Sequence, residues 1–227
     1  AVTALRTTRR YGEGIGALAA ALREGDADRV LSLLTADTDD DAPLGLVDPD
    51  DDAALGRLRA RLLEHALSVR TAALEGDAEA AVPALDARRP PGARRGGRGG
   101  VQPGTRQVER WLGDSTGTAV GAAWGHEWYP GRPLLVTAND YGLGLFNGDT
   151  GVVVRAGDEL RAVIAGVGEH ATFAPSRLSD VETLHAMTVH KSQGSQARDV
   201  TVLLPPADSP LLTRELFYTA VTRAQSR

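Results

Sequence analysis

The residues best suited to chemistry lie near the carboxyl end, where residues 186–196 read AMTVHKSQGSQ. Apolar residues open this stretch and a second apolar run, 200–204, follows it, so we expect two buried strands with a loop between them. Such a loop lies at the carboxyl edge of a sheet, where α/β folds bind ligands. Hydroxyl, imidazole and ammonium donors suit phosphates, and a glycine lets a ligand approach the backbone closely. The candidate binding residues are Thr188, His190, Lys191, Ser192, Gln193 and Gly194.

The chain then closes with an amphipathic segment, 213–224, which predicts a helix with Arg223 near its end. Transfer of a phosphoryl group places negative charge on equatorial oxygens, and a positioned guanidinium can raise the rate of such a reaction by orders of magnitude. Arg223 is therefore the candidate catalytic residue of this segment. Taken alone, an arginine on a terminal helix would also fit a solvated surface position.

In this order, the two segments resemble motifs V and VI of superfamily 1 DNA helicases, and their sequences are most similar to those of the RecD-type helicases. The sequence RRY at 9–11 looks like motif IV. The resemblance implies that Arg10 and Arg223 are catalytic contacts to the terminal phosphates of ATP, with Arg223 as an arginine finger. It also implies ATP contacts for Gly194 and Gln196. Gln196 stands where the family has a glutamate that contacts the nucleotide sugar, and it can still accept a hydrogen bond.

The implied fold class is α/β, a RecA-like, P-loop-type second motor domain (2A) interrupted by a small SH3-like β insertion (2B). We place the first part of 2A at 1–137, the insertion at 138–180 and the second part of 2A at 181–227. Short β-rich runs around the turn sequence NGD at 147–149 suggest the insertion, and in the resembled family this turn lies near single-stranded DNA. The expected DNA-binding residues are Asn139, Asn147, Thr188, His190, Lys191, Ser192 and Gln193.

The implied function is the carboxyl-terminal motor lobe of an ATP-dependent 5′-to-3′ DNA helicase, as in the alpha subunit of exodeoxyribonuclease V in double-strand break repair and recombination. Its expected partners are single-stranded DNA and RecB- and RecC-like subunits, and its cofactor is ATP with Mg²⁺. The sequence has no GxxxxGK[ST] phosphate loop and no Asp-Glu pair after an apolar strand. The chain also begins at Ala1 without methionine and ends just after motif VI. We therefore expect the Mg²⁺ ligands on a missing amino-terminal RecA-like lobe, no metal ligand in this chain, and no ATP hydrolysis by the chain alone.

Three other interpretations remain open at this point. The chain could come from a stand-alone RecD-like helicase without partner subunits, act as a non-enzymatic single-stranded DNA-binding module, or be an inactive pseudogene product. The last is suggested by 88–104, an irregular stretch whose first part is rich in arginine, glycine and proline, where the resembled family has an apolar strand. A frameshift and a real basic loop explain this departure equally well, and a real one should remove a strand from the sheet.

Apolar periodicity predicts helices that would cover one side of the sheet. Ile15, Leu18 and Leu22 share a face of the first helix, which Gly25 should end, and Asp26 should cap the next helix. The acidic, turn-rich stretch 35–52 reads as a solvated loop. Further helices are expected to start near 50–52 and to cover 77–87 and 105–112.

Composition excludes several classes of protein. The 227 residues, 42% of them hydrophobic, suffice for the core of one or two domains. Absence of cysteine rules out disulfides and thiolate metal sites, and the five histidines lack the spacing of a zinc cluster. A net charge of −5 argues against a generally basic nucleic-acid coat. No apolar run approaches the roughly 20 residues of a membrane span, so we expect a cytoplasmic protein that has no membrane partner.

Overall fold

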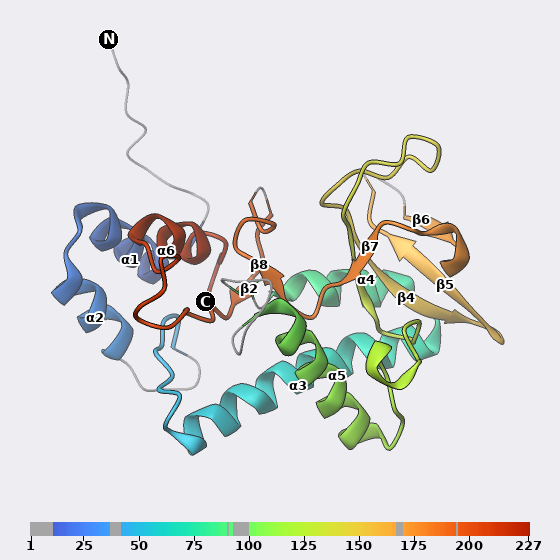
Figure 1. The fold of residues 1–227 in the computed structure, drawn as a ribbon, viewed down its shortest axis with the longest axis horizontal. Coiled ribbons are helices and arrows are strands. Elements are labelled where there is room, and N and C mark those ends of the chain that lie inside the picture. Colours follow the sequence, from blue (N-terminus) through green and yellow to red (C-terminus); the bar gives the residue numbers. More distant parts are fainter. Residues whose placement is uncertain (1–10, 37–41, 90, 93–99, 167–169, 194) are drawn as a thin grey trace, which may run out of the picture.

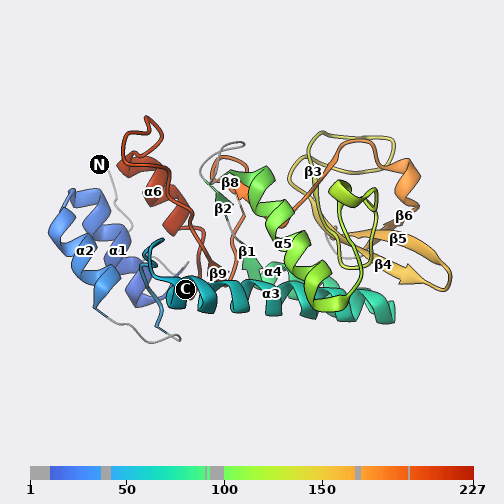
Figure 2. The same ribbon diagram turned by 60° about the horizontal axis from the view of Figure 1, so that its bottom comes forward.

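The computed structural model describes residues 11–36, 42–89, 91–92, 100–166, 170–193 and 195–227. The arrangement is elongated, with a group of helices at one end, a five-stranded sheet at the other and one long helix running between them (Figures 1 and 2). The helices are α1 (Glu13–Glu24), α2 (Ala27–Thr35), α3 (Asp52–Glu75), α4 (Ala78–Ala87), α5 (Val101–Thr116) and α6 (Arg214–Val221), with short 3₁₀ turns η1 (Ala122–Trp124) and η2 (Pro175–Arg177).

Local signals set the ends of the first helices as the sequence predicts. Gly25 ends α1 in the left-handed conformation at φ 75°, which glycine adopts without steric cost. The carboxylate of Asp26 accepts a hydrogen bond from the Arg29 backbone N–H at 2.9 Å and so caps α2. Asp51 caps α3 in the same way by accepting from the N–H groups of Ala53 and Ala54. These caps confirm that the acidic turns begin helices.

The main sheet is antiparallel and has the strand order β6-β5-β4-β3-β7. It contains the short strands expected in the insertion, and it is wider than the predicted range 138–180, because a strand from each flank joins it. Leu135 of the first flanking strand pairs with both Thr150 and Glu182. The strands are β3 (Pro133–Val136), β4 (Thr150–Ala156), β5 (Glu159–Ile164), β6 (Ala171–Phe173) and β7 (Val181–Thr183).

Both faces of this sheet carry buried apolar side chains. Val152 and Val154 of β4 lie in one cluster with residues of α3 and α4, including Val69 and Val82. Val153 belongs to a second cluster that contains residues of β3 and β5. Since side chains alternate between the two faces of a strand, β4 is sandwiched between helices on one side and its own loops on the other. This burial fixes the register of the sheet.

The stretch rich in arginine and glycine is less irregular than predicted. Residues 88–89 form β1, which pairs in parallel with β9 (Asp199–Val200), and residues 91–92 form β2, which pairs in parallel with β8 (Met187–Thr188). The helix α5 already begins at Val101, so residues 101–104 are helical as well. The expectation of a wholly irregular 88–104 is therefore wrong, because backbone pairing with the distant strands does not depend on the side-chain composition. Residues 90 and 93–99 lie outside the described part.

The two strands around the 186–196 stretch are shorter than expected. β8 and β9 contain two residues each, and the second apolar run is only partly buried, with Leu204 45% exposed. The class is α/β with an antiparallel sheet and, among the described residues, two small parallel strand pairs. Among the described helices none is long and apolar enough to cross a membrane.

Gly151 provides a test of the main sheet. A Cβ atom there would overlap the Val163 carbonyl oxygen on the neighbouring strand. We expect Gly151→Ala to lower the free energy of unfolding by about 1–3 kcal/mol, as overpacking does, in urea denaturation monitored by circular dichroism.

Gly56→Ala is the matched control, because Gly56 lies inside α3 with open space around it. Alanine is the better helix former, so this variant should gain about 0.5–1 kcal/mol. A Gly151→Ala chain as stable as the parent would show that β4 and β5 are not paired in this register.

Candidate nucleotide and nucleic-acid site

The stretch that follows the 188–196 loop lies against the carboxyl-terminal residues of the chain. Ala197 and Ala224 form a parallel β-bridge, with the Ala197 N–H donating to the Arg223 carbonyl at 3.0 Å and the Gln225 N–H donating to the Ala197 carbonyl at 2.9 Å. The Val200 N–H donates to the carbonyl of Arg227 at 2.7 Å. The two segments that sequence analysis singled out are therefore neighbours in space.

Arg223 links these two segments through its guanidinium. Its Nε donates to the Thr219 carbonyl at 3.1 Å and its Nη1 to the Ser195 carbonyl at 3.3 Å, while Nη2 lies 3.4 Å from the Thr222 hydroxyl. The side chain is folded back onto α6 and reaches the end of the loop. It could bind a phosphate only by exchanging one or more of these hydrogen bonds to neutral oxygens for stronger, bidentate ones to an anion.

The other predicted nucleotide contacts divide into two groups. Gln196 sits between Ser195 and Ala197, directly beside the Arg223 contact, and is half-buried. Gly194 and Arg10 lie outside the described residues. Among the described residues, the Gly12 N–H donates to the Gln225 carbonyl at 2.8 Å.

The 188–193 part of the loop is a tight turn stabilised by its own hydroxyl groups. Thr188 Oγ1 accepts from the Lys191 N–H at 3.2 Å. Ser192 is 3% exposed, and its hydroxyl donates to the Val189 carbonyl at 2.7 Å, so this residue fastens the turn. His190 and Gln193 are exposed and present donors at the surface. Of the predicted DNA contacts in this loop, these two are thus the ones open to solvent, while Ser192 is turned inward.

The Lys191 ammonium forms an ion pair with Glu182, with Nζ to Oε2 at 2.6 Å. Glu182 lies on β7, so the pair connects the loop to the edge of the main sheet. Both side chains are partly exposed, at 26% and 47%. Sequence reasoning did not find this acidic partner, because only the pairing of β7 with β3 brings it beside the loop.

The two predicted asparagines lie together in the loop between β3 and β4. Asn139 Oδ1 accepts a hydrogen bond from the Asn147 N–H at 2.8 Å, and both residues are exposed. Gly148 has φ 102°, as a tight turn requires. The turn interpretation of NGD is therefore confirmed, and the amide of Asn147 remains at the surface.

A buried polar network holds the segment just before β8. The Tyr129 hydroxyl lies 2.8 Å from Nε2 of His185 and donates to Glu109 of α5 at 3.3 Å. Burial lowers the pKa of His185 to about 3 and raises the pKa values of Tyr129 and Glu109. His185 is therefore neutral, and it aligns the chain that enters the loop. The spacing of the histidines in the sequence did not predict this role.

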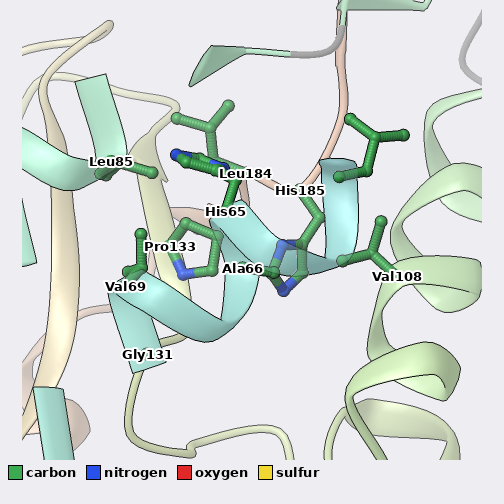
Figure 3. Close-up of a pocket in the computed structure, with 10 residues that line it drawn as sticks. His65, Ala66, Val69, Leu85, Val108, Gly131, Pro133, Leu184 and His185 are labelled. Carbon is green, nitrogen blue, oxygen red and sulfur yellow. The ribbon is translucent and has the colours of Figure 1, made fainter. Parts of the chain in front are cut away.

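An apolar pocket adjoins this network (Figure 3). His65 and His185 are its two imidazoles, and the Nε2 atom of His65 lies 2.8 Å from the Ala84 carbonyl. Its other lining groups are aliphatic side chains and glycine. The pocket thus offers packing and no cluster of groups for catalysis. It is lined by Leu62, His65, Ala66, Val69, Leu85, Val108, Gly131, Pro133, Leu184 and His185.

Comparison with known proteins agrees with this geometry. Residues 183–227 match the UvrD-like helicase C-terminal domain. The chain is 54% identical over 226 residues to the RecBCD enzyme subunit RecD of Mycolicibacterium smegmatis, and 52% identical over 234 residues to that of Mycobacterium tuberculosis. The chain is a relative of RecD. Both alignments cover 100% of the chain and 38% of the relative.

Other similarities to the RecD-related chain are partial or loose. The ATP-dependent RecD2 DNA helicase of Deinococcus radiodurans is 37% identical over 98 residues, 43% of this chain and 14% of that protein. A crystal structure of Pif1 helicase from Bacteroides in complex with ADP-AlF3 and ssDNA aligns with 97% of this chain and 48% of its own at a TM-score of 0.42 and 12% identity. The sequence relatives of the chain are thus RecD subunits and a RecD2 helicase, and its residues 183–227 match a helicase C-terminal domain.

Two described side chains of the RecD-related chain are suited to contacts with a nucleotide. Arg223 could face a terminal phosphate, and Gln196 has an amide that can bond to a sugar hydroxyl. Within the described residues no group of three or more His, Asp or Glu side chains could hold a metal ion.

The buried His185 makes stability depend on pH. Its pKa in the folded chain is about 3, below the usual value of 6.5, so the unfolded chain binds more protons between these values. The contribution is fully present above pH 6.5 and declines as pH falls toward 3. We expect the free energy of unfolding to fall by up to about 2 kcal/mol more between pH 7 and 5 in the parent than in His185→Gln.

Urea denaturation at each pH would measure this difference. The other titratable groups are the same in the parent and in His185→Gln. The difference between their pH slopes therefore reports on His185 alone. A parent and variant with the same pH slope would show that folding does not lower the pKa of His185.

Proposed function

We propose that this chain is the carboxyl-terminal motor lobe of an ATP-dependent, 5′-to-3′ DNA helicase of the RecD type. The observation that carries the proposal is the bond between Arg223 and the Ser195 carbonyl, which joins a phosphate-sensing arginine to the loop suited to DNA. Similarity over the whole of this chain to part of two RecD subunits supports the same function. By that similarity the chain works in the cytoplasm with RecB- and RecC-like subunits in double-strand break repair.

The contact between Arg223 and the Ser195 carbonyl suggests how ATP hydrolysis could be coupled to DNA binding. ATP held with magnesium by an amino-terminal lobe would supply the phosphoryl transfer. Arg223 would then leave the Ser195 carbonyl to stabilise charge on the transferred group. Because Ser195 ends the loop, this exchange alters the restraint on His190 and Gln193 at its other end. Nucleotide state and grip on DNA would thus be coupled through one hydrogen bond.

The DNA contacts proposed for the loop are electrostatic and polar. Lys191 would bind a phosphate in place of the Glu182 carboxylate, and His190 and Gln193 would donate from the exposed side of the turn. Asn139 and Asn147 belong to a second loop on the same sheet that carries Glu182. Thr188 and Ser192 would act mainly by holding the turn in shape.

The domain organisation that we propose keeps a RecA-like domain 2A and an SH3-like insertion 2B, with one adjustment. The strands β3 to β7 form one sheet, so we would extend the insertion to include β3 and β7. The remaining helices and the short parallel pairs would then belong to 2A.

A stand-alone helicase is the second candidate, since the RecD2 helicase of Deinococcus radiodurans is also similar. The RecBCD subunits of Mycolicibacterium smegmatis and Mycobacterium tuberculosis match the whole chain at 54% and 52% identity, whereas that of Haemophilus influenzae matches 44% of it and RecD2 matches 43%. The two whole-chain matches favour a subunit of a larger enzyme. Co-purification with two large subunits supports the first function, and purification of an active helicase without them supports the second.

Arg223 tests the motor function. In a complete protein with both lobes, Arg223→Ala should lower ATP turnover stimulated by single-stranded DNA about 1,000-fold or more, because a charge-stabilising arginine contributes that much in related chemistry. Phosphate release measures the turnover. Arg198→Ala removes an exposed neighbouring arginine and should leave turnover near the parent value.

The 227-residue chain alone should release no phosphate, with or without single-stranded DNA. Turnover by the pure chain would contradict the assignment to a single lobe. An unchanged rate for Arg223→Ala in the complete protein would contradict the arginine-finger role.

The Lys191–Glu182 pair tests the DNA contact. Lys191→Ala should weaken binding of single-stranded DNA and reduce the slope of log affinity against log salt by about 1, since one phosphate contact is lost. Glu182→Gln should strengthen binding, because the DNA phosphate no longer competes with a carboxylate. Fluorescence anisotropy over a salt series would measure both effects.

Glu159→Gln is the matched control, since it breaks an ion pair of the same length, 2.6 Å, on β5, which β4 and β3 separate from β7. It removes the same charge without releasing Lys191. If Glu159→Gln and Glu182→Gln raise the affinity equally, the effect comes from net charge and the local competition is refuted.

A further inference from the structure

Two aromatic rings are exposed side by side in the loop between β3 and β4. Tyr141 is 80% exposed and Phe146 is 52% exposed. Their ring centroids lie 6.3 Å apart with an angle of 79° between the planes, an edge-to-face pair. Aromatic residues make up only 4% of the chain, and leaving large apolar rings in water forgoes the free energy of burial. We therefore expect the two rings to contact a ligand.

The loop that carries the rings is firmly held. Asp140 and Leu145 exchange two backbone hydrogen bonds of 2.8 and 2.9 Å, and Leu145 is buried in the cluster beneath the sheet. The Asp140 carboxylate also accepts from the N–H groups of Gly142 and Leu143. Asp149 Oδ2 accepts from the Phe146 N–H at 2.8 Å. Ring positions are thus set before any ligand binds, which lowers the entropy lost on binding.

The same hydrogen bonds engage the carboxylates of both acidic residues of the loop. Asp140 and Asp149 are both partly buried, and each directs an oxygen toward backbone N–H groups beside the rings. Their negative charge is therefore partly compensated within the loop. What the loop presents outward is the ring pair and the exposed residues Asn139 and Asn147.

The ring loop is continuous with the proposed phosphate-binding loop. It leaves β3, which pairs with β7, and β7 carries Glu182, the partner of Lys191. The Thr137 N–H, at the start of the ring loop, donates to the Asp180 carbonyl at 2.9 Å. In both views the segment after β3 and the segment after β8 project on the same side of the molecule (Figures 1 and 2).

We propose that Tyr141 and Phe146 form a base-stacking platform for single-stranded DNA. The inference rests on the proposed function, since Lys191 would hold the phosphates of the same strand. Bases in a single strand expose faces that stack on aromatic rings regardless of sequence, whereas those of a duplex are already stacked. Polar amides beside the rings and a cation along the strand suit a nucleic acid better than an apolar protein surface.

The test compares two strands of equal length, oligothymidylate and the corresponding abasic strand. The 227-residue chain should bind oligothymidylate more tightly, by about tenfold for each ring that stacks. Tyr141→Ala and Phe146→Ala should each remove about tenfold on oligothymidylate and change nothing on the abasic strand. The salt slope should stay constant, because no phosphate contact is lost.

Three variants serve as controls. Trp124→Ala removes another aromatic ring, 63% exposed, from a different loop and should leave both affinities unchanged. Tyr141→Phe and Phe146→Tyr keep the rings and should bind as the parent does. Thermal unfolding of each variant would confirm that it is folded.

The outcomes separate this inference from the proposed function. Equal binding of the two strands by the parent chain, or full binding of oligothymidylate by the double alanine variant, overturns the platform and leaves the phosphate contacts standing. Failure of the parent chain to bind either strand at low salt overturns the proposed function, and the platform with it. Loss of binding to a partner subunit with unchanged binding of oligothymidylate would assign the rings to a protein interface, against this proposal.

Discussion

The close parallel approach of residues 197–200 to the last residues of the chain is the constraint on which the rest of the site depends. Ala197, Ala220 and Ala224 are buried there, at 3%, 0% and 4% exposed. Small side chains allow two backbones to come within hydrogen-bonding distance without a gap. Arg223 reaches the Ser195 carbonyl only because of this approach. A bulky residue at any of the three positions would separate the arginine from the loop.

The loop itself is fastened at three separate points. The neutral His185 anchors its entry to Tyr129, Lys191 ties its middle to the sheet, and Arg223 holds its end. Each fastening has a different physical character: a buried neutral contact, a partly exposed ion pair and a guanidinium–carbonyl bond. Salt would weaken the second most, because screening acts on exposed charges. The loop can therefore loosen in its middle while its ends remain in place.

Local signals could be predicted from the sequence, and pairings between distant segments could not. Gly25 and Asp26 act through their own neighbours, so the ends of α1 and α2 were predictable. Residues 88–89 form a strand only because 199–200 lie beside them, and composition cannot show this. The same holds for the partner of Lys191, since Glu182 lies nine positions away and on a different element.

The candidate site shows the same division. Sequence analysis singled out 188–196 and 213–224 as candidate segments from the types and order of their residues, and the structure brings the ends of these segments together. Exposure could not be predicted, because a Tyr or Phe in a β-rich stretch ordinarily packs in a core. Only the backbone bonds of Asp140 and Leu145 show that Tyr141 and Phe146 are turned outward.

The topology also bears on the order in which the chain folds. β4 and β5 adjoin in sequence, so their sheet closes short loops, whereas Arg88 must find Asp199 and α1 must find α6 across most of the chain. Closing long loops costs more chain entropy, and non-local contacts form slowly. We expect the antiparallel sheet to assemble first and the two ends of the chain to meet last. Arg223 would thus be among the last residues placed, so a partly folded chain would contain its sheet and lack the contact between Arg223 and Ser195.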